Sequence, residues 1–370
     1  MNNKPSAEAL RKTKDFYNQV KGAKILQRDF GYYSLDRWIS EGHIKDHNEL
    51  VQLWGQDEMA VFNLGSLGWC EAAFLPAFEE KILEDRGEHE LVQDYAGRHV
   101  LYFKGRRNGF MPEYVDHPVK DNETWERDVK WRLDPSSPER TPNPETMARA
   151  KEMAAAGGMV CQGVIGGYMY LRSLVGPEGA LYLFYDDPDL IHSMMETWFN
   201  LADSVIASHQ AHVELDELFL AEDICYNHGP LISPDMMREF LFPYYQQLIT
   251  NIKARQPKKG LPFLQIDTDG DCRPVIPVYQ ELGANYFSPF EVASGCDVVE
   301  LRKQYPDMLM RGGIDKRELA KGKEAIDRMV DRIMPFMAEH GGYIPTSDHG
   351  VPEEVSFEDY MYFRKRLKEF

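Results

Sequence analysis

Residues 217–245 read ELFLAEDICYNHGPLISPDMMREFLFPYY, and this stretch decides the fold. Its first six residues form a short, mostly apolar run that ends on an acid, which is typical of a buried β-strand. Ser233 followed by Pro234 predicts a helix start, because serine caps a helix and proline suits its first turn. Apolar residues then recur at helical spacing, at Phe240, Leu241, Tyr244, Tyr245, Leu248 and Ile252. A strand followed by a helix is the repeating unit of a parallel α/β sheet.

The same alternation of strand and helix patterns extends from about residue 155 to the end of the chain. One further strand-like run lies before residue 155. The predicted strands are 60–64, 159–165, 217–222, 262–267, 285–288, 308–312 and 342–346. Asp187 before Pro188 marks a second helix start, and the Met and Trp residues that follow fall on one apolar face. That face predicts core packing rather than a cofactor site.

Residues 104–147 interrupt this rhythm with charged residues, proline and asparagine, and we interpret them as an excursion outside the sheet. Lys104, Arg106 and Arg107 would suit an acidic partner, but a solvated loop is the simpler explanation.

Composition excludes several classes of function. Of 370 residues, 42 are Lys or Arg and 60 are Asp or Glu, which gives a net charge of -18. Such a charge repels phosphate backbones and anionic lipid surfaces, so we expect neither nucleic acid nor a membrane as partner. The uncharged stretch 153–171 contains five glycines and reads as a helix end entering a central strand. Five cysteines without a CxxC pair, and an N-terminus without an apolar signal-peptide core, favour a reducing cytoplasm.

Familiar catalytic motifs are missing from the sequence. It has no GxxxxGK[ST], no GxGxxG after a strand and no GxSxG. His209 and His212 are three residues apart on a predicted helix, and we interpret them as part of its solvated face rather than as metal ligands.

Acids follow the predicted strands one after another. These strand-end residues are Glu222 and Asp223; Asp267, Asp269 and Asp271; Glu291; Asp315, with Arg311; and Asp348, with His349. If the sheet closes into a barrel, all of them face one mouth, where barrel enzymes place their active sites. Acids this close need a proton, a cation or a metal, and Arg311 and His349 are the nearest candidates. The alternative is that each acid only caps a helix, as Asp269 or Asp271 would before residues 274–282.

At these strand ends the chain resembles the uroporphyrinogen decarboxylase superfamily. The matching blocks, in order, are residues 220–245, DTDGD at 267–271, residues 281–298, RGGIDKREL at 311–319, and GGYIPTSDHGVPEEVSFEDY at 341–360. The resemblance implies an α/β fold, a (β/α)8 TIM barrel with its site at the C-terminal face. We therefore expect one domain over 1–370, with an N-terminal helical extension over 1–55 and an insertion over 104–147.

Two branches of the superfamily fit poorly. The tetrapyrrole decarboxylase holds a polyanionic substrate with an arginine-rich N-terminal segment, but LQRDFGYYSLDRW at 26–38 offers only Arg28 and Arg37. The thiol methyltransferases bind zinc through a His-x-Cys-Gly block, whereas this chain has Asp267-Thr268-Asp269-Gly270. Cys272 and Cys296 lie nearby, and Cys296 is expected to be buried.

A third branch takes methyl groups from O- or N-methyl compounds and passes them to a corrinoid protein. The resemblance to it implies an O-demethylase-type methyltransferase with a small methyl donor as substrate. The chain lacks a DxHxxG corrinoid signature, so the corrinoid would arrive on a separate carrier protein. The alternatives are a tetrapyrrole decarboxylase and a non-catalytic small-molecule-binding barrel.

We assign residues to this function as follows. The catalytic residues are predicted to be His349, Asp267 and Glu222; the substrate-binding residues Tyr168, Tyr226, Phe290 and Arg311; and the ligands of a divalent metal, most simply zinc, Asp267, Asp269, Glu291 and His349. Arg311 is also expected to neutralise the acids.

Overall fold

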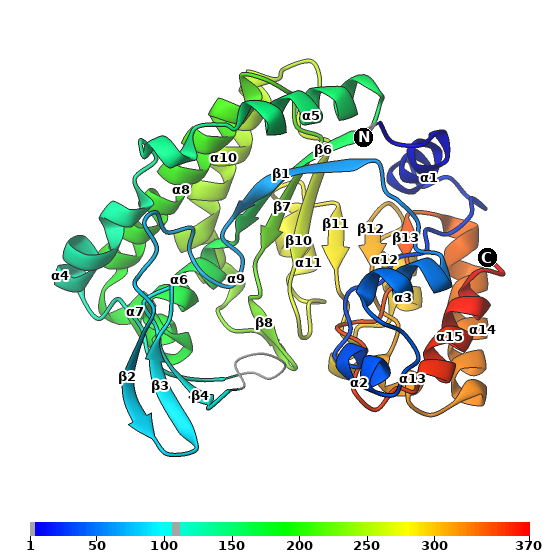
Figure 1. The fold of residues 1–370 in the computed structure, drawn as a ribbon. Helices are drawn as coiled ribbons and strands as arrows, with labels where there is room; N and C mark the ends of the chain where they lie inside the picture. The colour runs from blue at the N-terminus through cyan, green and yellow to red at the C-terminus, as the bar shows by residue number, and fades with distance from the viewer. Residues whose placement is uncertain (1–3, 106–111) are drawn as a thin grey trace.

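A parallel sheet forms the centre of the protein in the computed structural model, which describes residues 4–105 and 112–370 (Figure 1). Among these residues the sheet has seven strands in the order β1-β6-β7-β10-β11-β12-β13. The strands are β1 (Val61–Leu67), β6 (Met159–Ile165), β7 (Glu217–Ala221), β10 (Phe263–Asp267), β11 (Tyr286–Ser288), β12 (Leu309–Arg311) and β13 (Tyr343–Ile344). Each overlaps a predicted strand, and the expected barrel-type α/β fold is confirmed.

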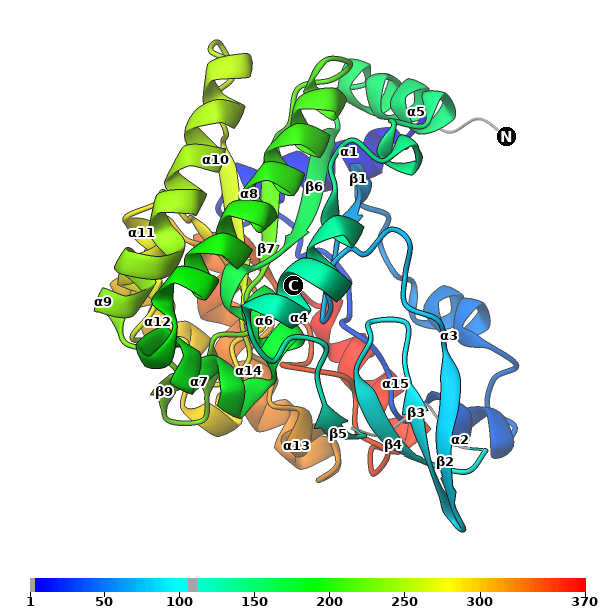
Figure 2. The same cartoon turned by 90° about the vertical axis from the view of Figure 1, so that its left-hand side faces the viewer.

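Helices lie along the outer face of the sheet and return the chain to its starting edge (Figures 1 and 2). They are α5 (Pro144–Ala155), α6 (Gly167–Val175), α7 (Pro177–Asp186), α8 (Pro188–Gln210), α9 (Pro234–Met236), α10 (Phe242–Arg255), α11 (Ile276–Gln280), α12 (Val298–Gln304), α13 (Lys316–Leu319), α14 (Lys323–His340) and α15 (Phe357–Leu367). Both predicted helix starts are confirmed, since Asp187 accepts from the Leu190 N–H at 3.1 Å and Ser233 from the Met236 N–H at 3.2 Å. A π-helical turn, Met237–Leu241, joins α9 to α10. It precedes Pro243, which has no N–H to donate to the previous turn.

Buried apolar side chains form two separate clusters. The larger one lies between the sheet and the outer helices and includes Met194, Met195 and Trp198 of α8, as predicted. The smaller one consists of Phe16, Tyr17, Leu26, Tyr286, Leu309 and Ile344. Here α1 (Ala7–Tyr17) packs on the residues that begin the strands, and the Tyr17 hydroxyl donates to Glu217 Oε2 at 2.6 Å. The first helix therefore closes the N-terminal end of the sheet.

The rest of the N-terminal region packs against the end of the chain. It holds α2 (Leu35–Ser40) and α3 (His47–Trp54), which lie beside α15 in Figure 1. Tyr32 pairs with Val351 in a parallel bridge, and Asp29 Oδ1 accepts from the N–H and the hydroxyl of Ser347 at 3.1 and 2.8 Å. Residues near 30 thus lie next to the loop that follows β13.

The excursion differs from the predicted irregular loop. It begins before residue 104, with an antiparallel sheet of β2 (Lys81–Arg86), β3 (His89–Gln93), β4 (His99–Phe103) and β5 (Glu113–Asp116). Short helical turns follow: α4 (Asn122–Thr124), η1 (Trp125–Val129), η2 (Lys130–Leu133) and η3 (Pro138–Arg140). Lys104 pairs with Asp85 at 2.6 Å, while Arg106 and Arg107 lie outside the described residues. A small hairpin, β8 (Cys225–Tyr226) and β9 (Gly229–Pro230), follows β7.

Residues 153–171 form the end of α5, strand β6 and the start of α6, in agreement with the expectation. Within the described part of the chain, no helix combines the length and the apolar character that crossing a membrane would require.

Candidate functional site at the C-terminal edge of the sheet

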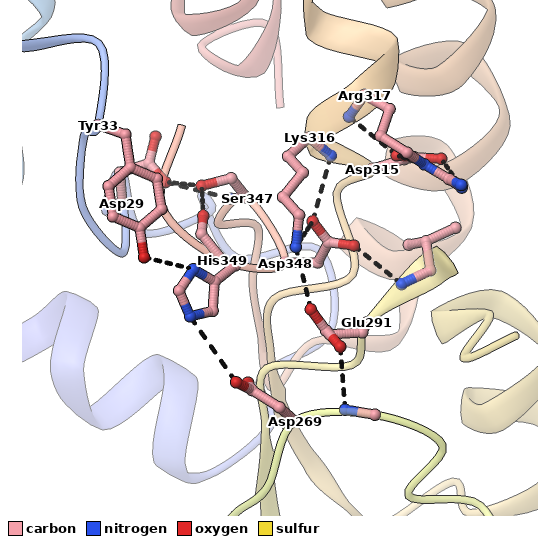
Figure 3. A network of polar contacts seen from close by, with 12 residues as sticks. Asp29, Tyr33, Asp269, Glu291, Asp315, Lys316, Arg317, Ser347, Asp348 and His349 are labelled. Carbon is pink, nitrogen blue, oxygen red and sulfur yellow. Dashed lines mark hydrogen bonds and ion pairs between the residues drawn. The ribbon is translucent and has the colours of Figure 1, made fainter. Parts of the chain in front are cut away.

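Charged side chains meet at the edge of the sheet where the parallel strands end (Figure 3). The Asp269 carboxyl is close enough to Asp223, Asp267, Glu291 and Lys316 to interact with their charges. His349 likewise interacts with Lys316, Glu291 and Asp223. We call this group the edge cluster: Asp223, Asp267, Asp269, Glu291, Lys316, Asp348 and His349. The structure therefore brings the four predicted metal ligands to one place, among other charged groups.

Lys316 neutralises two of these acids. Its Nζ lies 3.0 Å from Glu291 Oε1 and 3.7 Å from Asp348 Oδ1. The Asp348 carboxylate also accepts from the backbone N–H groups of Val292 at 2.9 Å and Lys316 at 3.2 Å. Sequence reasoning missed Lys316, whose only signal was its place next to Asp315 after a strand.

Arg311 neutralises only part of the cluster: its charge acts on Asp267, as expected, whereas Glu291 and Asp348 pair with Lys316. Arg311 Nη2 contacts the Asp29 carbonyl at 3.5 Å, and the Arg311 charge also acts on Glu217 deeper inside the sheet. Its Nε is buried without a hydrogen-bond partner.

Asp269 and His349 form the least constrained pair of the cluster. Asp269 Oδ2 lies 3.7 Å from His349 Nε2, and the other ring nitrogen of His349 is 3.2 Å from the Tyr33 hydroxyl. Burial, and then the charges of Asp223, Glu291 and Asp267, raise the pKa of Asp269 to about 8. Its side chain is still 42% exposed, so solvent screens part of this effect, but burial and the three neighbouring carboxylates act in the same direction. Burial and the Lys316 charge lower the pKa of His349, which favours the neutral ring.

Asp223 adopts a backbone conformation that is rare for residues other than glycine. Its φ is +39°, and its N–H donates to the Asp267 carbonyl at 3.1 Å. Its carboxylate pairs with Arg172 of α6 at 2.7 Å. Strained residues of this kind gather at functional sites, where the surrounding structure holds them in place. The sequence marked Asp223 as a strand-end acid without a role and missed Arg172.

Glu222 and Asp267 are held by hydrogen bonds behind the exposed part of the cluster. Glu222 is fully buried and accepts from the Tyr168 N–H at 2.9 Å and the Tyr245 hydroxyl at 2.5 Å. Burial raises its pKa to about 7 and that of Asp267 to about 6. Asp267 accepts a hydrogen bond from the Ser288 hydroxyl. These contacts anchor the start of α6 to β7, and β10 to β11.

Only one of the aromatic residues predicted to bind substrate is exposed. Tyr226 is 46% exposed, whereas Tyr168 and Phe290 are both fully buried. Phe290 packs in the main core, a correction to its predicted place on the wall of the site. Tyr168 is also core, and its hydroxyl is buried without a hydrogen-bond partner.

Two other rings lie against His349. Tyr33 stacks on it with centroids 5.7 Å apart and planes 18° apart, and Phe30 lies 5.2 Å away. Both are exposed, at 50% and 37%. The sequence could not show this contact, because some 320 residues separate these rings from His349.

The predicted ligand set does not fit a metal ion as it stands. The oxygens of Glu291 are taken by Lys316 Nζ and by the Gly270 N–H, each at 3.0 Å. Asp267 is bound to Ser288, which leaves Asp269 and His349 as the facing pair. Across residues 4–105 and 112–370, no three His, Cys, Asp or Glu side chains are grouped as metal ligands. The arrangement instead suits proton transfer, with a carboxylic acid beside a neutral imidazole.

Comparisons with known proteins agree with this architecture. The model of the uroporphyrinogen decarboxylase (URO-D) family matches residues 113–370. A uroporphyrinogen decarboxylase of Alcanivorax borkumensis is 25% identical over 197 residues, 50% of either chain. One of Hydrogenobaculum sp. is 22% identical over 132 residues, 36% of either chain. The chain thus spans half or less of the length of these curated relatives. A solved structure, a methyltransferase from Methanosarcina mazei, has the same fold, with a TM-score of 0.56 at 14% identity over 97% of both chains.

Proposed function

Because the chain belongs to the uroporphyrinogen decarboxylase family, we propose that it works as a methyltransferase within that family. It would move a methyl group from a small O- or N-methylated compound to a corrinoid carried by a separate protein. The observation that carries the proposal is Asp269, a partly exposed carboxyl group whose pKa is raised to about 8 beside a neutral His349.

Demethylation of an ether needs an electrophilic group at the leaving oxygen, a metal ion or a proton donor, and such an acid can be the proton donor. The reduced corrinoid attacks the methyl carbon, the carbon–oxygen bond breaks, and its electron pair moves to the oxygen. The leaving oxygen must then be neutralised, and a proton from Asp269 turns it into a hydroxyl group. An acid with a pKa near the working pH is both protonated and able to give up its proton.

The remaining residues of the cluster support this step in distinct ways. His349 lies next to Asp269 and can relay a proton from solvent to it after the reaction. Lys316 holds Glu291 and Asp348, and so limits the negative charge around the acid. Tyr33 and Phe30 offer exposed rings for an apolar substrate. Glu222 and Asp267, which we had predicted to be catalytic, act in this scheme as positioning residues.

The proposal is tested with reduced cobalamin as a free acceptor. The protein is mixed with it and with a panel of methoxyaryl and methylamine compounds, and the methylcobalamin spectrum is followed. We expect turnover of at least one donor, and the same rate after dialysis against a chelator. No spectral change with any donor would contradict the proposal. Loss of carboxyl groups from uroporphyrinogen would instead support the tetrapyrrole decarboxylase alternative, and inertness in both assays would support a binding role.

A further inference from the structure

Two of the five cysteines face each other directly behind the edge cluster. Cys272 Sγ and Cys296 Sγ lie 3.6 Å apart, and the two residues are 1% and 0% exposed. Cys272 belongs to the loop after β10, which also carries Asp269. Cys296 belongs to the loop after β11, which also carries Glu291. A bond between the two sulfurs would therefore join the loop that carries Asp269 to the loop that carries Glu291.

We propose that Cys272 and Cys296 are a redox site, whose oxidation to a disulfide ties these loops together and changes the geometry of the edge cluster. A disulfide has its sulfurs about 2.05 Å apart, so from 3.6 Å they must approach by about 1.5 Å. The movement is small enough for two neighbouring loops to share.

The connection from the thiols to the site runs through Gly270. Cys296 Sγ lies 3.5 Å from the Gly270 carbonyl, and the Gly270 N–H donates to Glu291 Oε2 at 3.0 Å. Gly270 has little room to yield, because a side-chain carbon added there would lie 2.6 Å from the backbone of Tyr226. A shift of Cys296 is therefore expected to disturb the Glu291 contact, and with it the charges around Asp269.

The local chemistry favours Cys296 as the reacting thiol. The hydrogen bond with Cys272 lowers the pKa of Cys296, and the nearby Arg273 guanidinium acts in the same direction. A thiolate at Cys296 attacks hydrogen peroxide, breaks the O–O bond and becomes a sulfenic acid, releasing hydroxide. The Cys272 thiol then attacks that sulfur, forms the S–S bond and releases water.

The test uses the full chain with Cys70→Ser, which removes the exposed thiol. After peroxide treatment, we expect the intact mass to fall by two hydrogen atoms and non-reducing peptide mapping to show a Cys272–Cys296 link. Dithiothreitol should restore the original mass. Cys272→Ser should abolish the loss, whereas Cys161→Ser, at a buried thiol bonded to Glu217, should leave it intact.

The effect of the disulfide on the edge cluster is measured without any activity assay. The His349 ring signals, assigned by their loss in His349→Asn, should shift between the reduced and oxidised forms. A link between other cysteines, oxidation to sulfinic acid only, or no reaction would overturn the redox site. A Cys272–Cys296 link without a shift at His349 would overturn its effect on the cluster. None of these outcomes depends on whether the protein transfers methyl groups.

Discussion

Asp269 is the residue at which the proposed chemistry makes its clearest prediction. If its proton is donated in methyl transfer, the rate should be constant below the pKa and fall as the pH rises through about 8. Asp269→Asn, which keeps the size but offers no acidic proton, should lower the rate by about 100-fold and remove this decline. The measurement is the initial rate of methylcobalamin formation between pH 6 and 9.

A matched control comes from Asp235, whose side chain is 96% exposed. Asp235→Asn should leave both the rate and the pH profile unchanged. A wild-type rate that stays level across this range would argue that Asp269 is not the acid.

Lys316 makes a second prediction at the same scale. Lys316→Met removes the cation from Glu291 and from Asp348, whose side chain is 1% exposed, and should lower the free energy of unfolding by about 2 kcal/mol. Because the Lys316 charge lowers the pKa of His349, that pKa should rise in the variant. The measurements are urea unfolding and NMR titration of the His349 ring. The control is Lys321→Met, which removes an exposed pair with Glu318 and should change neither the free energy of unfolding nor the pKa of His349. An unchanged His349 pKa in Lys316→Met would show that the Lys316 charge does not act on His349.

At the scale of elements, the loops after β11 and β12 pack backbone against backbone. Gly312 has a φ of +114°, and a side-chain carbon there would lie 1.8 Å from the Pro289 carbonyl oxygen. Gly312→Ala should therefore lower the free energy of unfolding by more than about 3 kcal/mol. Gly260→Ala is the control, because Gly260 also has a positive φ, +67°, but open space around it, so that only about 1 kcal/mol is expected. Equal costs in urea unfolding would mean that the two loops can separate easily.

The elements also show which patterns a sequence reveals. The central strands were predictable because they are buried and read as short apolar runs between helix signals. The antiparallel sheet was not, because β2 reads KILEDR and is exposed at every position. A strand with no buried face has no alternation of polar and apolar residues to detect.

For the whole molecule, the strand ends predicted where the acids meet, but not what holds them. The carboxyl ends of parallel strands lie at one edge of the sheet whatever the conformation of the loops, so Asp269 and Glu291 had to lie at the same edge. The strand-end acids read from the sequence therefore located the site. Lys316 and Tyr33 contact these acids and His349 only because of how the loops and the N-terminal segment fold back. Such contacts depend on tertiary packing, and no local pattern in the sequence encodes them.

The buried acids also set how stability depends on pH. The pKa values of Glu222, Asp267 and Asp269 are raised in the folded protein, to about 7, 6 and 8, mainly by burial. Between the unfolded values near 4 and these values, the folded state binds more protons than the unfolded state. The contribution of these groups is therefore complete below about pH 4 and is lost as the pH rises through the folded values. We expect these three groups to lower the free energy of unfolding as the pH rises from 5 to 8.5, by at most about 1.4 kcal/mol per pH unit for each of the buried Glu222 and Asp267. The contribution of Asp269 should be smaller, because its side chain is 42% exposed and solvent screens it.

Urea unfolding at pH 5.5, 7 and 8.5 measures this slope. Asp271 and Asp315 have the opposite behaviour, since Arg273 and Arg317 pair with them and their pKa values are lowered, so their contribution is lost only on acidification below about pH 4. Burial lowers the pKa values of His99, His117, His209 and His349, so these histidines raise the stability as the pH increases to about 6.5. Above about pH 7 the decline is therefore left mainly to Glu222 and Asp269. Asp269→Asn should make the decline shallower, because it removes the acid with the highest of the three values. A stability that is level or rises from pH 7 to 8.5 would show that Glu222 and Asp269 are ionised throughout this interval, and would remove the proton donor on which the proposed methyl transfer depends.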